Sequence, residues 1–208
     1  MYIPKDFAEA DPARLAALMA EASFALVVTT DQDGRPFASH LPLVYDADEG
    51  TNGTLLGHMA RANPQWRHFE AGGEALAVFS GPHAYVSPSW YETHPSVPTW
   101  NYAAVHAYGR AQLMDETATR ALLQRLVDTY EAGFASPWRL ELPQKYEAMM
   151  LRGIVGFRIP VARLEGKFKL SQNRDATDRA NVAAELARSG FDDGRAVARL
   201  MREREAGA

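Results

Sequence analysis

Strands separated by short turns fill most of the first 114 residues, and this pattern limits the fold more than any other feature. The run Phe24–Thr30 is continuous, apolar and rich in β-branched side chains, which is typical of a buried strand. A turn with Gly34 and a strand at residues 37–45 complete a hairpin. Further strands are predicted at residues 54–59, 74–80, 84–87 and 100–114, with one or two more at residues 154–170.

Few helices interrupt these strands. The pairs Asp11-Pro12 and Asn63-Pro64 each place a capping residue before a proline, which predicts short helices to about residues 22 and 69. Longer amphipathic helices are expected from residues 115 and 143, and two terminal helices at residues 175–189 and 192–205. This order does not fit alternating βαβ units. It predicts a mainly β or α+β fold, an antiparallel barrel with peripheral helices. We expect one domain over residues 1–208, with the helical pair at about 175–205 packed on it.

Composition excludes several kinds of chemistry. The chain has 208 residues, no cysteine and a net charge of −4. Thiolate metal sites, iron–sulfur clusters and cysteine nucleophiles are therefore excluded. The six histidines are scattered, so no metal site is expected, and the glycine-rich phosphate and dinucleotide motifs are missing. No apolar run approaches the roughly 20 residues that span a bilayer. The N-terminal residues lack the order of a signal peptide, so we expect a cytoplasmic protein without membrane contact.

Three segments stand out as candidate binding sites. Residues 58–66 join a strand to a helix start, where Arg61 beside free backbone amides would suit a phosphate. Residues 85–102 hold two tryptophans and three tyrosines among prolines, a composition suited to enclosing a planar ring. Residues 167–174 are dense in hydrogen-bond donors. Each segment also has a structural interpretation: a capped helix with a surface arginine, tryptophans that plug one end of the barrel, and ordinary strand-to-helix capping.

Together these segments carry a resemblance to a known family. The motifs that carry it are residues 1–4, Ser39-His40-Leu41-Pro42, residues 58–66, 85–91, 97–102 with 105–106, and 167–173. They occur in the order found in the FMN-binding split-barrel proteins of the PaiB type, which are described as negative transcriptional regulators. The chain resembles this family over about residues 1 to 200.

The resemblance implies a six-stranded antiparallel Greek-key split barrel like that of pyridoxamine-phosphate oxidase, working as a homodimer with FMN at the subunit interface. It implies that Arg61 and Asn63 serve the phosphate and that Ser39, His40 and Leu41 line the ring system. Trp90, Thr99, Trp100 and Asn101 would complete the pocket, and Lys169, Ser171 and Gln172 would close it. Lys169 and His106 are candidates for a donor near the N1/O2 edge of the flavin. No catalytic residue is assigned.

Binding FMN does not by itself define a function. The first hypothesis is a transcriptional regulator with redox sensing, as the family description implies. The alternatives are an FMN-dependent oxidoreductase or flavin reductase that uses NAD(P)H, and a haem-handling or flavin-storage protein. Direct DNA binding has weak support, because a DNA reader normally shows a basic face. Here only the C-terminal helices are basic, through Arg188, Arg195, Arg199, Arg202 and Arg204.

Overall fold

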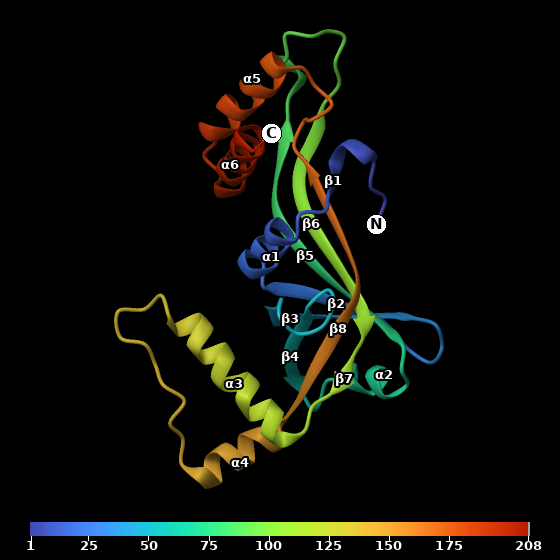
Figure 1. Ribbon diagram of the computed structural model, residues 1–208, viewed down its shortest axis with the longest axis vertical. Coiled ribbons are helices and arrows are strands. Elements are labelled where there is room, and N and C mark those ends of the chain that lie inside the picture. The colour runs from blue at the N-terminus through green and yellow to red at the C-terminus, as the bar shows by residue number, and fades with distance from the viewer. Residues whose placement is uncertain (208) are drawn as a thin grey trace. The chain divides into compact units, whose positions relative to one another are not determined.

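The computed structural model describes residues 1–207. Its contacts divide the chain into two compact units. Unit 1 comprises residues 1–22, 79–106 and the chain from Glu165 onward, and unit 2 comprises residues 23–78 and 107–164. Three long strands contribute residues to both units (Figure 1): β5 (Glu74–Val86), β6 (Thr99–Arg110) and β8 (Ile154–Lys169).

Unit 2 is built on three consecutive antiparallel strands, β2 (Phe24–Thr30), β3 (Pro36–Asp46) and β4 (Thr54–Ala60). The register sets Val27 opposite Ser39 and Leu43 opposite Gly57. Strand β5 then returns to pair with β2, which gives the spatial order β5-β2-β3-β4. This is the order of a Greek key.

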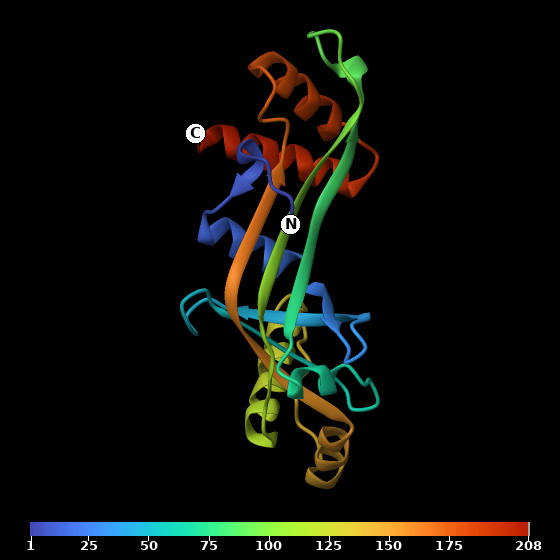
Figure 2. The ribbon, with the colours of Figure 1, turned by 90° about the vertical axis from the view of Figure 1, so that its right-hand side faces the viewer.

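The hydrogen-bonded neighbours form a closed cycle of six strands. The order runs β8-β4-β3-β2-β5-β6, and β6 pairs again with β8. Two strands of two residues each, β1 (Ala8–Glu9) and β7 (Gln112–Leu113), pair with β8 outside this cycle. The prediction of an antiparallel Greek-key barrel in an α+β fold is therefore confirmed, with eight strands in the sheet and six of them in the cycle. Figure 2 shows the long strands β5, β6 and β8 side by side.

Unit 2 holds the helices α2 (Trp66–Glu70), α3 (Glu116–Glu131) and α4 (Gln144–Arg152). Asp115 caps α3 by accepting the backbone N–H of Ala118 at 2.7 Å. The buried face of α3 carries Leu122 and Leu126, which pack against Leu56 of β4. The amphipathic pattern predicted for this helix is thus used to cover the sheet.

Unit 1 contains α1 (Pro12–Glu21), α5 (Ala176–Ala187), α6 (Asp192–Ala206) and the single turns η1 (Lys5–Phe7) and η2 (Pro88–Trp90). The two C-terminal helices pack together, and their apolar side chains are buried. These are Val182, Leu186, Val197 and Met201. No helix within residues 1–207 combines the length and the apolar character that a membrane crossing would need.

Three boundaries differ from the sequence-based prediction. The strand predicted over residues 100–114 ends as β6 at Arg110, and residues 112–113 form the separate strand β7. The predicted strands at 74–80 and 84–87 form one continuous strand, β5, although Gly81-Pro82 indicates a break. Gly81 does not form a turn. It allows Leu18 to pack closely against the strand, because a Cβ at this position would lie 2.5 Å from Leu18 Cδ1. The helix predicted from Asn63 begins only at Trp66, because the residues between form a turn.

Candidate functional site

The thirteen predicted site residues fall into two groups, one in each unit. Ser39, His40, Leu41, Arg61 and Asn63 belong to unit 2. Trp90, Thr99, Trp100, Asn101, His106, Lys169, Ser171 and Gln172 belong to unit 1. Each group has its own geometry.

Strand alternation separates the three candidates on β3. Leu41 is buried in the core, whereas the side chain of His40 is exposed on the opposite face. The His40 ring stacks on the ring of Phe24, with centroids 5.9 Å apart. Ser39 shares the face of Leu41. The three residues therefore cannot all present side chains to one face of a flat ligand.

The turn before α2 is tied to the sheet by side-chain amides. Asn63 donates through Nδ2 to Ser39 Oγ at 2.8 Å and accepts the backbone N–H of Gln65 through Oδ1 at 3.0 Å. Gln65 is completely buried and donates to the carbonyl oxygen of Val27 at 2.9 Å and to Thr29 Oγ1 at 3.1 Å. The contact between Ser39 and Asn63 thus brings two predicted site residues together across a gap of 24 positions.

Arg61 has a structural role in this turn. Its Nε donates to the carbonyl oxygen of Arg152, and its Nη2 donates to that of Ile154, both at 2.9 Å. The carbonyl of Arg152 is at the C-terminal end of α4, where a positive charge is favourable, and that of Ile154 is at the start of β8. A guanidinium carries five N–H donors. The two bonds therefore leave donors on an exposed side chain for an anionic ligand.

His58 on β4 is a polar group that the predicted site did not include. Its Nδ1 is buried and finds no hydrogen-bond partner among the described residues. Burial lowers the pKa of His58, so the ring is held neutral. His58 is the first residue of the 58–66 segment, so the sequence motif pointed to this part of the chain but not to the histidine itself. An unpartnered buried nitrogen is visible only in three dimensions.

In unit 1, Lys169 joins two predicted residues. Its Nζ donates to Thr99 Oγ1 at 2.5 Å and to the carbonyl oxygen of Trp100 at 2.6 Å. Burial lowers the pKa of Lys169, and the positive charges of Lys167 and Arg174 lower it further. The amine therefore gives up its proton more readily than an ordinary lysine does.

Three other unit 1 candidates form hydrogen bonds with one another or with nearby backbone groups. Asn101 is completely buried and donates to Ser171 Oγ at 2.9 Å. Ser171 is itself buried and has φ 65°, an unusual backbone conformation for a residue with a side chain. The Gln172 amide accepts the backbone N–H of Leu170 at 2.6 Å and donates to the carbonyl of Phe168. These contacts fix the turn after β8.

The remaining candidates are rings. His106 on β6 is half-buried, and burial is the main cause of its lowered pKa. The side chains of Trp90 and Trp100 line a pocket that includes Tyr85 and Phe191. Within residues 1–207, no three His, Asp or Glu side chains gather to hold a metal ion.

Comparisons with known proteins agree with this fold. The chain is 41% identical over 206 residues to the Protease synthase and sporulation protein PAI 2 of Bacillus subtilis, covering 98% of each chain. An uncharacterised protein of Emericella nidulans is 35% identical, with 80% of this chain and 81% of that protein covered.

Solved structures share the fold at low sequence identity. The FAD and heme binding protein from Mycobacterium smegmatis matches with a TM-score of 0.62 and 17% identity, covering 83% of this chain and 78% of that chain. The flavocytochrome Anf3 from Azotobacter vinelandii matches with a TM-score of 0.61 and 18% identity, covering 84% and 75%. A family model described as "Putative FMN-binding domain" matches residues 1–163. With more than three quarters of its length matched, the chain belongs to this FMN-binding family.

Proposed function

We propose that the protein is an FMN-binding regulator of the PaiB type, whose response depends on the bound flavin. The matched residues 1–163 include the whole unit 2 group, and the relative PAI 2 is named for protease synthesis and sporulation. The observation that carries the proposal is the bond between Asn63 and Ser39, which fixes the turn of Arg61 against the sheet. A turn held in this way needs little rearrangement to receive a ligand.

The unit 2 residues fit the chemistry of a flavin monophosphate. The free donors of Arg61 and the amide of Asn63 would hold the phosphate, because charge-assisted bonds from a guanidinium suit its oxygens. The exposed ring of His40 and the backbone of Ser39 and Leu41 would contact the ring system. The unpartnered Nδ1 of His58 is a further polar group at this strand end. When bound, the flavin would supply one- and two-electron redox chemistry.

A second copy of the chain would complete the site. Thr99 and Lys169 form a polar cluster in unit 1, and we assign it to the flavin bound by the partner in a homodimer. Lys169, with its lowered pKa, would place a proton donor beside the ring. His106 remains a candidate for the same edge. The turn next to this cluster would be held in place by Asn101, Ser171 and Gln172, whose polar groups bond to one another and to the backbone.

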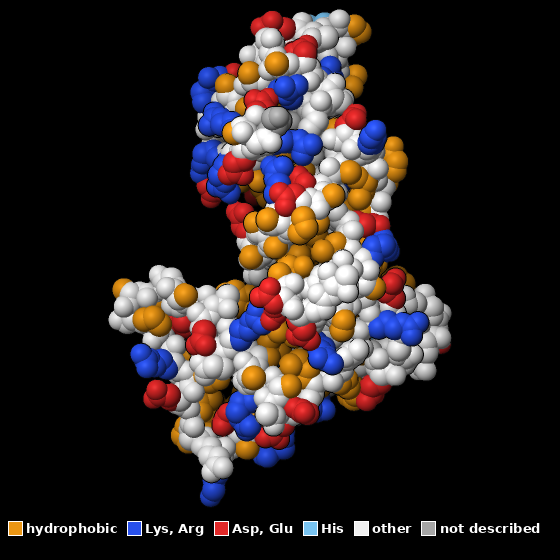
Figure 3. All heavy atoms as spheres, in the orientation of Figure 1, with side chains coloured by type: hydrophobic (Ala, Val, Ile, Leu, Met, Phe, Trp, Pro, Cys, Tyr) orange, Lys and Arg blue, Asp and Glu red, His pale blue; other side chains and the backbone are white. Residues whose placement is uncertain are grey.

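The surface of the C-terminal helices favours indirect regulation over DNA binding. Figure 3 shows acidic and basic side chains side by side over α5 and α6. Arg188 pairs with Glu185 and Arg195 with Asp192, while Arg199 lies 3.2 Å from Glu21. Paired arginines are less available for the phosphates of DNA. Regulation in the cytoplasm through another protein therefore fits these helices better.

The flavin proposal is tested by comparing FMN with riboflavin, which lacks the phosphate. Arg61→Ala should weaken FMN binding at least tenfold, because a charge-assisted hydrogen bond contributes roughly 1.5–3 kcal/mol. Riboflavin affinity should not change, and this comparison separates the loss of a phosphate contact from damage to α4. Arg158→Ala is the matched control, since Arg158 is an exposed arginine of unit 2 that pairs with Glu49. Equal losses for both flavins would contradict the phosphate assignment.

A second candidate function is a flavin reductase, favoured by the lowered pKa of Lys169. Rapid bleaching of the FMN-loaded protein by NADH or NADPH, with recovery in air, would support turnover. Very slow bleaching would support the regulator.

A gel shift at physiological salt with random competitor DNA tests direct DNA binding. The triple variant Arg195→Glu/Arg199→Glu/Arg202→Glu is the one to compare with the unchanged protein.

A further inference from the structure

Unit 1 contains a pocket that includes Trp90 and Trp100, which the resemblance assigned to the flavin, but neither the Thr99–Lys169 cluster nor any unit 2 residue of the proposed flavin site. It has a volume of about 500 Å³ and lies where β5, η2 and the start of β6 meet α5, α6 and the loop between these helices. We call it the aromatic pocket, after its four rings. They are Tyr85, Trp90, Trp100 and Phe191. Pockets of this size accept molecules as large as a drug or a cofactor.

The rings of the aromatic pocket are unusually accessible. Trp100 is 53% exposed and Phe191 is 80% exposed. The Trp100 and Tyr85 rings form a T-shaped pair with centroids 5.9 Å apart, and the centroid of the His83 ring lies 6.1 Å from that of Trp100. Exposed aromatic rings can receive a further flat or positively charged group.

The charges of the lining residues indicate the sign of charge that a ligand of the pocket would carry. The described residues that line the pocket include the carboxylates of Glu185 and Asp193, and none of these lining residues is a lysine or an arginine. Glu185 pairs with Arg188 outside the lining, whereas Asp193 Oδ2 lies 3.4 Å from His83 Nδ1. Electron-rich ring faces beside a carboxylate favour a cation and disfavour a phosphate.

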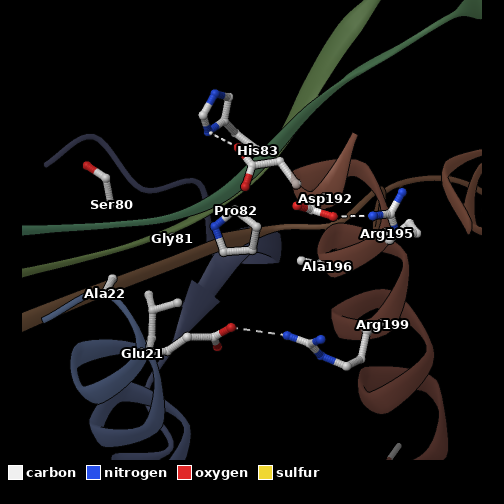
Figure 4. A pocket seen from close by; sticks show the side chains of 12 residues that line it. Glu21, Ala22, Ser80, Gly81, Pro82, His83, Asp192, Arg195, Ala196 and Arg199 are labelled. Atoms are coloured by element: carbon white, nitrogen blue, oxygen red, sulfur yellow. Dashed lines mark hydrogen bonds and ion pairs between the residues drawn. The ribbon is translucent and has the colours of Figure 1, made fainter. Parts of the chain in front are cut away.

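The neighbouring hollow shows a different arrangement. It lies between α1 and α6 and shares His83 and Asp193 with the aromatic pocket. In Figure 4, Glu21 reaches Arg199 and Asp192 reaches Arg195, so each of these arginines already has a carboxylate partner. That hollow therefore offers no cation that lacks a partner in the structure, and it does not extend the aromatic pocket toward an anionic ligand.

We propose that the aromatic pocket binds an organic cation with an apolar or aromatic body. Its positive group would lie against the faces of Trp100 and Tyr85, near the carboxylate of Asp193, and its apolar body would cover Trp90 and Phe191. This site is separate from the flavin proposal, since neither the Arg61 turn nor the Thr99–Lys169 pair lines it. The protein would thereby respond to a second kind of ligand besides the flavin.

A pair of ions with the same shape and opposite charge tests the proposal. Isothermal titration of the FMN-loaded protein should show saturable binding of tetraphenylphosphonium and at least tenfold weaker binding of tetraphenylborate. Trp100→Ala should weaken phosphonium binding at least tenfold, and Asp193→Asn should reduce the preference for the cation. Trp138→Ala is the control, because Trp138 is 50% exposed in unit 2.

The results separate this site from the flavin site. Phe191→Ala should weaken phosphonium binding and leave FMN affinity unchanged, which it would do even if the flavin assignment to Arg61 were wrong. Equal binding of the two ions would overturn the assignment of a cation. Failure of both ions to bind, or full phosphonium affinity in both Trp100→Ala and Phe191→Ala, would overturn the pocket itself.

Discussion

Single residues in this structure have structural contacts that their sequence neighbourhood does not reveal. Arg61 is predicted as a phosphate ligand, and in the structure its guanidinium donates to the carbonyls of Arg152 at the end of α4 and Ile154 at the start of β8. The sequence could indicate that an arginine stands beside a turn. It could not indicate which of its five donors the fold already uses, because the carbonyls belong to residues more than 90 positions away. The sequence did not indicate the role of Gln65 for the same reason, since its burial depends on β2, which is distant in the sequence.

Lys169 gives a prediction at the level of one titrating group. Its amine should titrate below the ordinary value of 10.5, because burial and two nearby cations disfavour the charged form. Between the folded and unfolded pKa values the unfolded chain binds more protons, so the free energy of unfolding should rise with pH there. NMR of the methylated lysine side chains measures the midpoint directly.

The control for Lys169 is its replacement by an uncharged side chain of similar length. In Lys169→Met the alkaline rise in the free energy of unfolding should disappear, and the shifted NMR signal should be missing. A Lys169 midpoint at or above 10.5 would contradict the role given to its surroundings.

Among the elements, the long strands show what sequence patterns can predict. Strands β2, β3 and β4 lie within one residue of their predicted ends, because their alternation and turn residues are local signals. Strand β5 continues through Gly81-Pro82, since the glycine makes room for Leu18 and for the carbonyl of Ala103. A glycine that ends a strand and a glycine that admits a neighbour look alike in sequence.

Gly109 on β6 gives a prediction at the level of strand packing. A Cβ there would lie 2.2 Å from the carbonyl oxygen of Pro160 and 2.8 Å from Ile159 Cγ2. The backbone atom cannot rotate away, so Gly109→Ala should lower the free energy of unfolding by about 2–3 kcal/mol, as overpacking does. Urea unfolding measures this. Gly133→Ala, where nothing lies within 4 Å, should be neutral or slightly stabilising, and similar losses in both variants would refute the packing argument.

At the scale of the whole molecule, β2 presents two apolar faces. Ala25 and Val27 are buried in the core, as the continuous apolar run predicted. The alternate side chains Phe24, Leu26 and Val28 face outward, and Phe24 is 67% exposed. Strand β5 continues this outer stripe, with Val78 opposite Leu26 and Leu76 opposite Val28. An apolar outer face is typical of an interface between subunits, and it agrees with the proposed homodimer.

The homodimer leads to the last prediction. If the outer stripe is its interface, folding and association are linked, so the Tm of the protein should rise with protein concentration. Leu26→Asp would place a charge in the stripe without filling the core. This variant should sediment as a monomer and lose FMN, because the partner's Lys169 cluster is then missing. Phe134→Ser, at a phenylalanine 63% exposed after α3, should leave both properties unchanged. A wild-type chain that stays monomeric at micromolar concentration while it holds FMN would show that one copy forms the whole site.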